Sequence, residues 1–203
     1  MSLLLAAVLA GVTSVAVAAD PPAKADLVPA LQKGGHVLFL RHPQTHPDQA
    51  DTDPLNLDNV SAQRQLTDAG RDQARALGAA LKRLKVPVGR VLASQFHRAR
   101  EAAGLLGLGE VEAALDVTEG GLVVSPDENQ RRAVALRKLL GTAPPAGTNV
   151  VVVSHRPNLQ DAAGKEFGDL GEGEVVVFRP LGDGTFRVVA RVAPPARWTE
   201  WAE

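Results

Sequence analysis

The chain has 203 residues, a formal net charge of -1, 45% hydrophobic residues and 22% charged residues, which suits one globular domain with a full core. This balance excludes a global field for nucleic acid or an anionic membrane surface, so any anion site must be a local cluster. Cysteine is absent and aromatic residues make up 3%, which excludes disulfides, thiolate catalysis and sulfur-ligated metals and argues against stacking platforms for single-stranded nucleic acid.

Residues 1–19 contain no charged side chain, and Leu3 to Leu9 form an apolar run that continues less strongly to Ala19. Ala16-Val17-Ala18 has the small-x-small pattern of a signal-peptidase site, and a polar segment begins at Asp20. We expect 1–19 to be a secretory signal peptide cleaved after Ala18 or Ala19, and 20–203 to be a periplasmic or secreted domain of a bacterial protein. The alternative is an uncleaved membrane anchor, although the run is short and interrupted for a spanning helix.

The rest of the chain alternates between strand and helix patterns. Apolar runs between glycine, proline and polar residues predict strands at 37–40, 88–93, 111–117, 149–153, 174–178 and 185–192. Helical spacing predicts helices at 26–31, 68–85, 95–107, 126–140 and 159–164, the second with Thr67 as its N-cap. We therefore expect an α/β fold: a three-layer sandwich whose mostly parallel central sheet is flanked by helices, with an antiparallel edge and a hairpin turn at 180–184.

Two of the buried strands end in a histidine: His42 follows the strand at 37–40, and His155 follows the strand at 149–153. The strand at 88–93 leads to Ser94 and then to Arg98 in the first turn of a helix, while Arg41 precedes His42. Carboxyl ends of parallel strands meet at one sheet edge, where ligands bind, and a helix N-terminus there adds N–H donors. Arginine binds phosphate with a planar fork, and a neutral histidine can attack phosphorus.

These residues predict a phosphate pocket with a histidine nucleophile, which the positive field of two guanidiniums should keep neutral. The alternative is that the strand-end histidines are structural and hydrogen-bond backbone carbonyls. A long polar connection, 43–63, begins directly after His42, and we expect it to cover the pocket because such loops are uncommon unless they are functional.

Four segments carry a resemblance to a known family. They are Leu40-Arg41-His42-Pro43-Gln44-Thr45, Leu66-Thr67-Asp68-Ala69-Gly70-Arg71-Asp72-Gln73-Ala74, Ser94-Gln95-Phe96-His97-Arg98-Ala99-Arg100-Glu101-Ala102-Ala103 and Val152-Val153-Ser154-His155. In this order they resemble the boxes of the histidine phosphatase superfamily, which includes phosphoglycerate mutase and phosphohistidine phosphatases. The resemblance runs from about residue 34 to 191. It departs from the family at Pro43 and Arg156, which replace the glycines that usually follow the two histidines.

The resemblance implies that His42 is phosphorylated during turnover and that Arg41, Arg98 and His155 bind the phosphoryl group. Thr45 and Arg156 are candidate substrate contacts, and Arg156 adds a cation at the rim that would suit doubly charged or extended substrates. The implied activity is hydrolysis of small phosphomonoesters, without a cofactor.

A general acid is needed to protonate the leaving alcohol. Glu119, before Gly120-Gly121, resembles the position at which branch-one members carry this glutamate. Asp127 and Glu128 are alternatives, although both also suit the first turn of a helix electrostatically. The aspartate that the second branch places after the second histidine is replaced here by Arg156.

His42 and His46 form an H-x-x-x-H pattern that can chelate a metal on a helix, but Pro43 and Pro47 disfavour a helix here. We expect no metal site and no nucleic-acid partner, and no membrane span after signal cleavage. The function we expect is an exported, metal-independent phosphatase that works through phosphohistidine. The alternative is a phosphate-binding or regulatory protein with the same pocket and little turnover. A mutase is disfavoured because the chain is short for that group and is expected to be exported.

Overall fold

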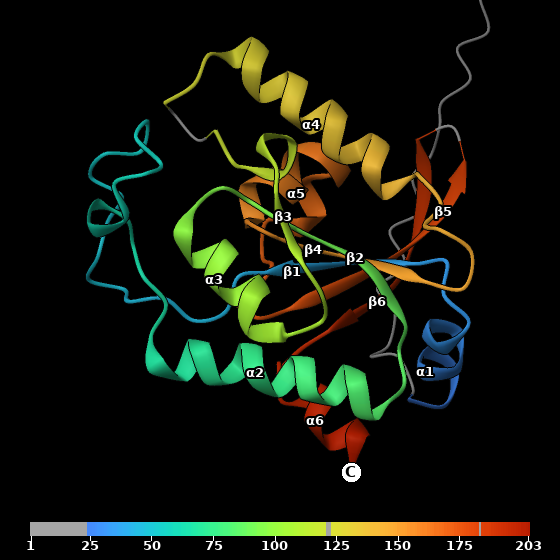
Figure 1. Ribbon diagram of the computed structural model, residues 1–203. Coiled ribbons are helices and arrows are strands. Elements are labelled where there is room, and N and C mark those ends of the chain that lie inside the picture. The colour runs from blue at the N-terminus through green and yellow to red at the C-terminus, as the bar shows by residue number, and fades with distance from the viewer. Residues whose placement is uncertain (1–23, 121–122, 183) are drawn as a thin grey trace, which may run out of the picture.

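The structure is a computed structural model that describes residues 24–120, 123–182 and 184–203 (Figure 1). The predicted signal peptide at 1–19 lies outside the described residues. Across those that are described, no helix is both long and apolar enough to cross a membrane.

Six strands form one sheet in the order β3-β2-β4-β1-β5-β6. Their bounds in chain order are β1 Val37–Arg41, β2 Val88–Ala93, β3 Val111–Ala113, β4 Asn149–Ser154, β5 Val175–Gly182 and β6 Thr185–Val192. The pairs β3·β2, β2·β4 and β4·β1 are parallel, whereas β1·β5 and β5·β6 are antiparallel. The predicted mostly parallel sheet with an antiparallel edge is confirmed.

Helices cover both faces of this sheet, so the predicted three-layer sandwich is also confirmed (Figure 1). Apolar residues of α1, α2, α3 and α6 pack on one face, and those of α4 and α5 pack on the other. The helix bounds are α1 Lys24–Gln32, α2 Asp68–Arg83, α3 His97–Leu106, α4 Pro126–Leu140, α5 Arg156–Ala163 and α6 Arg197–Ala202, with short 3-10 turns η1 Val60–Ala62, η2 Leu115–Val117 and η3 Lys165–Phe167.

The central strands are apolar on both sides because each face is covered. Leu38 and Leu40 of β1 join the core under α2, while Val37 and Phe39 join the core under α4. All four side chains are buried. A continuous apolar run is what a doubly covered parallel strand requires, and it explains why β1 and β4 are the most apolar strands of the chain.

Several helices and strands begin or end at other residues than predicted, because contacts at their ends determine these boundaries. The expected strand at 111–117 ends at Ala113 because η2 bends the chain toward Glu119. Helix α3 begins at His97, two residues later than predicted, because the Gln95 N–H donates to Thr118 Oγ1 (2.8 Å) and Phe96 is the N-cap. These contacts tie the start of α3 to the segment that leads to Glu119.

Helix α5 begins three residues earlier than predicted, directly after His155, which is its N-cap. Pro157 lies in the first turn of α5, where proline is tolerated because that N–H has no helical partner. The predicted hairpin turn is also shorter, because β5 extends to Gly182 and pairs Pro180 with Phe186. The early start of α5 places a helix N-terminus beside His155.

The polar connection after His42 is fastened to α2. Thr45 forms a β-bridge with Leu66, and Thr67 caps α2 by accepting the Gly70 N–H at 2.9 Å, as predicted. Gly70 lies so close to the loop that a Cβ there would be 2.1 Å from the Gln44 carbonyl oxygen. The glycine of this segment is therefore required by the close approach of α2 to the residues that follow His42.

Candidate active site

The sheet topology brings the two predicted histidines together. β1 and β4 are parallel neighbours, and Arg41 pairs with Ser154 at their carboxyl ends. The His42 N–H donates to the Ser154 carbonyl at 3.0 Å. The centroids of the His42 and His155 rings are 5.2 Å apart, and both residues are buried. The two imidazoles therefore share one small site at the carboxyl ends of the neighbouring strands β1 and β4.

His42 has the tautomer that a nucleophile needs. Its Nδ1 lies 2.9 Å from the Pro43 carbonyl oxygen, and since a carbonyl can only accept, Nδ1 must carry the hydrogen. Nε2 is left with a lone pair. Burial, followed by the charge of Arg98, lowers the pKa of His42 to about 3. Arginine charge was expected to keep this ring neutral, but burial is the larger cause.

Arg98 is fully buried in the first turn of α3, with its guanidinium 4.5 Å from the centroid of the Phe96 ring. Two carboxylates hold it: Nη1 donates to Asp51 Oδ1 at 2.9 Å, and Nη2 donates to Glu119 Oε1 at 3.0 Å. Its Nε is buried without a hydrogen-bond partner among the described residues. Asp51 comes from the long connection, which therefore reaches the site as expected.

His155 is also neutral, because burial and the charge of Arg98 lower its pKa well below the usual range. Its Nε2 lies 2.7 Å from Ser94 Oγ. That oxygen accepts the Phe96 N–H, so its own hydrogen is free to bond Nε2. Nδ1 then carries the ring hydrogen, and within the described parts of the chain it has no hydrogen-bond partner. Ser94 thus sets the tautomer that turns an N–H donor toward the site.

The predicted acid, Glu119, lies in this site. Its Oε1 is 3.5 Å from His155 Nδ1 and also accepts from Arg98. Burial raises the pKa of Glu119 despite the opposing charge of Arg98, and Asp51 raises it further. Of the two alternatives, Glu128 pairs with Arg131 and Arg132 on α4, and Asp127 is an exposed residue of the same first turn. The geometry favours Glu119 as the acid.

Arg41 and Thr45 both contact Glu172, a residue that no motif or periodicity indicates. Arg41 Nη1 donates to the Leu170 carbonyl at 2.6 Å, and its Nη2 is 3.5 Å from Glu172 Oε1. Thr45 Oγ1 donates to the same oxygen at 2.6 Å. Glu172 Oε1 is also 4.0 Å from His42 Nδ1. The segment before β5 therefore orients Arg41 and Thr45 on either side of His42 in the sequence.

Comparison with known proteins agrees with this geometry. Residues 37–120 match the model of the histidine phosphatase superfamily (branch 1), a span that runs from the first residue of β1 through Glu119. This part of the chain, less than half of its length, is similar to that family, as the four sequence segments predict. The predicted enzyme class, phosphoric monoester hydrolase, is confirmed with it. No protein with a curated description matches the chain.

Solved phosphatase structures share the fold at low sequence identity. The protein histidine phosphatase SixA, solved with tungstate, is 22% identical with a TM-score of 0.57, covering 80% of this chain and 98% of that chain. Phosphoserine phosphatase from Entamoeba histolytica with 3-phosphoglyceric acid is 15% identical with a TM-score of 0.56, covering 78% and 97%. A mycobacterial glucosyl-3-phosphoglycerate phosphatase is 18% identical with a TM-score of 0.51, covering 77% and 97%.

Two further arginines lie at the rim of the candidate site. Arg156, exposed at the start of α5, lowers the pKa of Arg41 through its charge. Arg64, half-buried at the end of the long connection, lowers the pKa of both histidines. Among the described residues neither has a carboxylate within 4 Å. Both cations are therefore open to an anionic ligand.

The H-x-x-x-H pattern does not form a helical pair, because His42 ends β1 and His46 lies in the following loop. In the described ranges, no group of three or more His, Cys, Asp or Glu side chains is arranged to hold a metal ion. Metal independence stays a prediction.

Proposed function

We propose that the protein is an exported, metal-independent phosphatase that hydrolyses phosphomonoesters through a phosphohistidine on His42. The observation that carries this proposal is the pair of buried donors without partners. Arg98 Nε and His155 Nδ1 have none among the described residues, although buried polar groups are almost always hydrogen-bonded. Phosphoryl oxygens are acceptors that would satisfy them, and Arg41 adds a third donor group at the end of β1.

In the first half-reaction, the Nε2 lone pair of His42 attacks phosphorus, and the bond from phosphorus to the ester oxygen breaks. Glu119, whose pKa is raised by burial, supplies the proton that the leaving alcohol needs. Arg41, Arg98 and His155 offset the charge that the phosphoryl oxygens carry in the transition state. The alcohol departs and the phosphoryl group remains on His42.

In the second half-reaction, a water molecule attacks the phosphohistidine. Glu119, now a carboxylate, accepts a proton from that water, and the bond from phosphorus to Nε2 breaks. Inorganic phosphate leaves, His42 regains its lone pair and Glu119 regains its proton. The cycle consumes only the ester and water, so it calls for no metal and no cofactor.

The experiment that tests this proposal is turnover of p-nitrophenyl phosphate by the wild type, His42→Ala and His46→Ala. We expect His42→Ala to abolish turnover, since the other unprotonated ring nitrogen of the described site, His155 Nε2, is engaged by Ser94 Oγ. His46→Ala is the matched control and should retain it, because within the described residues His46 is held by its backbone, which donates to the Gln65 carbonyl and accepts from the Gln49 N–H.

The same assay with excess EDTA should give the wild-type rate. Activity lost in EDTA and restored by a divalent cation would contradict metal independence. No turnover by the wild type would favour the alternative, a phosphate-binding or regulatory protein, and isothermal titration with inorganic phosphate would then detect the binding.

Export is proposed from the composition of residues 1–19. We expect mature protein to begin at Ala19 or Asp20, and intact-mass measurement of protein from the native host tests this directly. Retention of Met1 in a membrane fraction would contradict it.

A further inference from the structure

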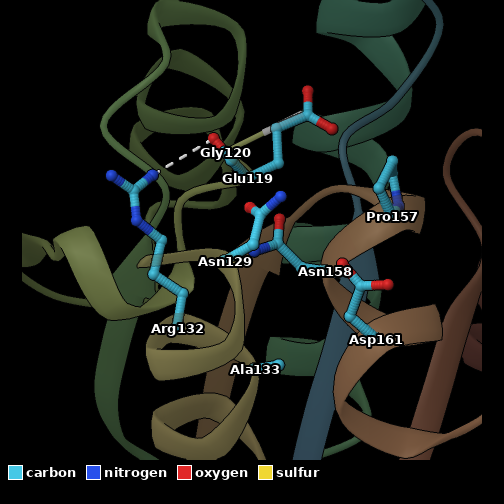
Figure 2. A pocket seen from close by; sticks show the side chains of 8 residues that line it. All are labelled: Glu119, Gly120, Asn129, Arg132, Ala133, Pro157, Asn158 and Asp161. Carbon is cyan, nitrogen blue, oxygen red and sulfur yellow. Dashed lines mark hydrogen bonds between the residues drawn. The ribbon is translucent and has the colours of Figure 1, made fainter. Parts of the chain in front are cut away.

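A cavity of about 230 Å³ lies between α4 and α5, next to the proposed acid (Figure 2). Its walls are one face of each helix, at the i, i+3, i+4 spacing that places residues on the same side. The lining residues are Glu119, Gly120, Asn129, Arg132, Ala133, Pro157, Asn158 and Asp161.

Glu119 separates this cavity from the phosphate site. Its carboxylate meets Arg98 and His155 on one side, and its backbone carbonyl accepts from Arg132 Nη1 at 3.3 Å on the other. Figure 2 shows the Glu119 carboxylate directed away from Asn129 and Asn158. A leaving group that extends from the Glu119 carboxylate over Pro157 would reach this cavity.

The charges that line the cavity leave it negative. Arg132 is engaged with Glu128 Oε1 at 2.7 Å and with the Thr118 and Glu119 carbonyls. Asp161 has no cation within 4 Å in the described part of the chain.

The cavity also has an apolar wall, to which Ala133 and Pro157 contribute. A carboxylate without a cationic partner beside an apolar wall suits a short alkyl chain that ends in a cationic group.

The position of Asp161 along helix α5 sets the length of the alkyl chain that could reach it. Asp161 lies six residues after His155, the N-cap of α5, and a rise of about 1.5 Å per residue places it roughly 9 Å further along the axis. An ester with a few carbons between phosphate and cation would span this distance.

We propose that the cavity binds the leaving group and that Asp161 selects phosphomonoesters that carry an ammonium group at the far end of a short alkyl chain. This rests on the proposed function, because Glu119 must face the leaving oxygen. The phosphoryl group occupies the His42 site, the chain lies over Glu119 and Pro157, and the ammonium pairs with Asp161.

The test compares kcat/KM for ω-aminoalkyl phosphates and n-alkyl phosphates of equal length, from two to eight carbons. The wild type should prefer the amino series by about tenfold at an intermediate length, the size of one charge-assisted hydrogen bond. Asp161→Asn should remove this preference by lowering kcat/KM for the amino series to that of the n-alkyl series. Asp127→Asn, which removes an equal charge from the exposed start of α4, should keep it.

Equal rates for the two series in the wild type, or a preference that survives Asp161→Asn, would overturn the proposal. If p-nitrophenyl phosphate is not turned over at all, the proposed function fails instead. In that case, calorimetry would measure the affinities of ω-aminoalkyl and n-alkyl phosphonates for the wild type and for Asp161→Asn. Tighter binding of the amino series, lost in the variant, supports the cavity, and equal binding contradicts it.

Discussion

At the scale of single residues, burial sets the protonation states that the chemistry needs. The same loss of water that lowers the pKa of His42 to about 3 raises the pKa of Glu119, because burial disfavours the charged form of each group. Burial therefore favours the unprotonated form of His42 and the protonated form of Glu119. The charge of Arg98 also lowers the pKa of His42, but it opposes the rise in the pKa of Glu119. Because the pKa of Glu119 is raised all the same, burial is the larger effect on that carboxyl.

Stability should depend on pH through the two buried histidines of the site, His42 and His155. Both have a pKa below the ordinary 6.5 in the folded state, so the unfolded chain binds more protons as the pH falls below 6.5. The free energy of unfolding should then fall with decreasing pH, by up to about 1.4 kcal/mol per pH unit for each histidine. His42→Ala should make this slope shallower in urea titrations between pH 6.5 and 4. Equal slopes for the two proteins would contradict a buried neutral His42.

Glu119→Gln should separate substrates by their leaving groups. An alkoxide leaves poorly without a proton, whereas nitrophenolate is stable near neutral pH, so alkyl phosphates should lose roughly 10²–10⁴-fold in kcat and p-nitrophenyl phosphate little. In the wild type, alkyl phosphate turnover should decline as pH rises through the raised pKa of Glu119. Asp127→Asn is the matched control and should affect neither substrate. A leaving-group dependence that appears in Asp127→Asn instead would move the acid to α4.

At the scale of elements, the segment that follows His42 depends on its contact with α2. Gly70→Ala would place a Cβ 2.1 Å from the Gln44 carbonyl oxygen, whereas a Cβ at Gly104 of α3 meets nothing within 4 Å. Gly70→Ala should therefore destabilise the fold by about 1–3 kcal/mol and reduce kcat, measured by urea unfolding and turnover. Gly104→Ala should be neutral or stabilising by up to about 1 kcal/mol. A Gly70→Ala protein as stable as Gly104→Ala would show that this contact is unimportant.

The helices and strands with clear periodicity could be predicted from the sequence, and so could the strand-end histidines. Helix α4, Pro126–Leu140, agrees with its predicted bounds, since proline, acidic residues and a serine cap define its start. Asp51, Arg64 and Glu172 shape the site from loops, where no periodicity links a residue to its partner. Their placement depends on tertiary contacts between segments far apart in the chain, such as Asp51 with Arg98.

At the scale of the whole molecule, the sheet order builds the site. β1 lies beside β4 although more than 100 residues separate them, and both run in the same direction. The sequence predicts that each strand ends in a histidine, but only the order of the strands makes the two rings neighbours. The net charge of -1 also conceals a local cluster of arginines, Arg41, Arg64, Arg98 and Arg156, around this one edge.

The most direct test of the phosphohistidine mechanism is to trap the intermediate. Wild-type protein mixed with p-nitrophenyl phosphate and quenched in base should carry one phosphoryl group, stable in base and lost in acid, on the peptide that contains His42. The same group should be absent from His42→Ala and present in His46→Ala, as measured by peptide mass spectrometry. A phosphoryl group on a serine or on His155, or turnover by His42→Ala, would contradict the mechanism.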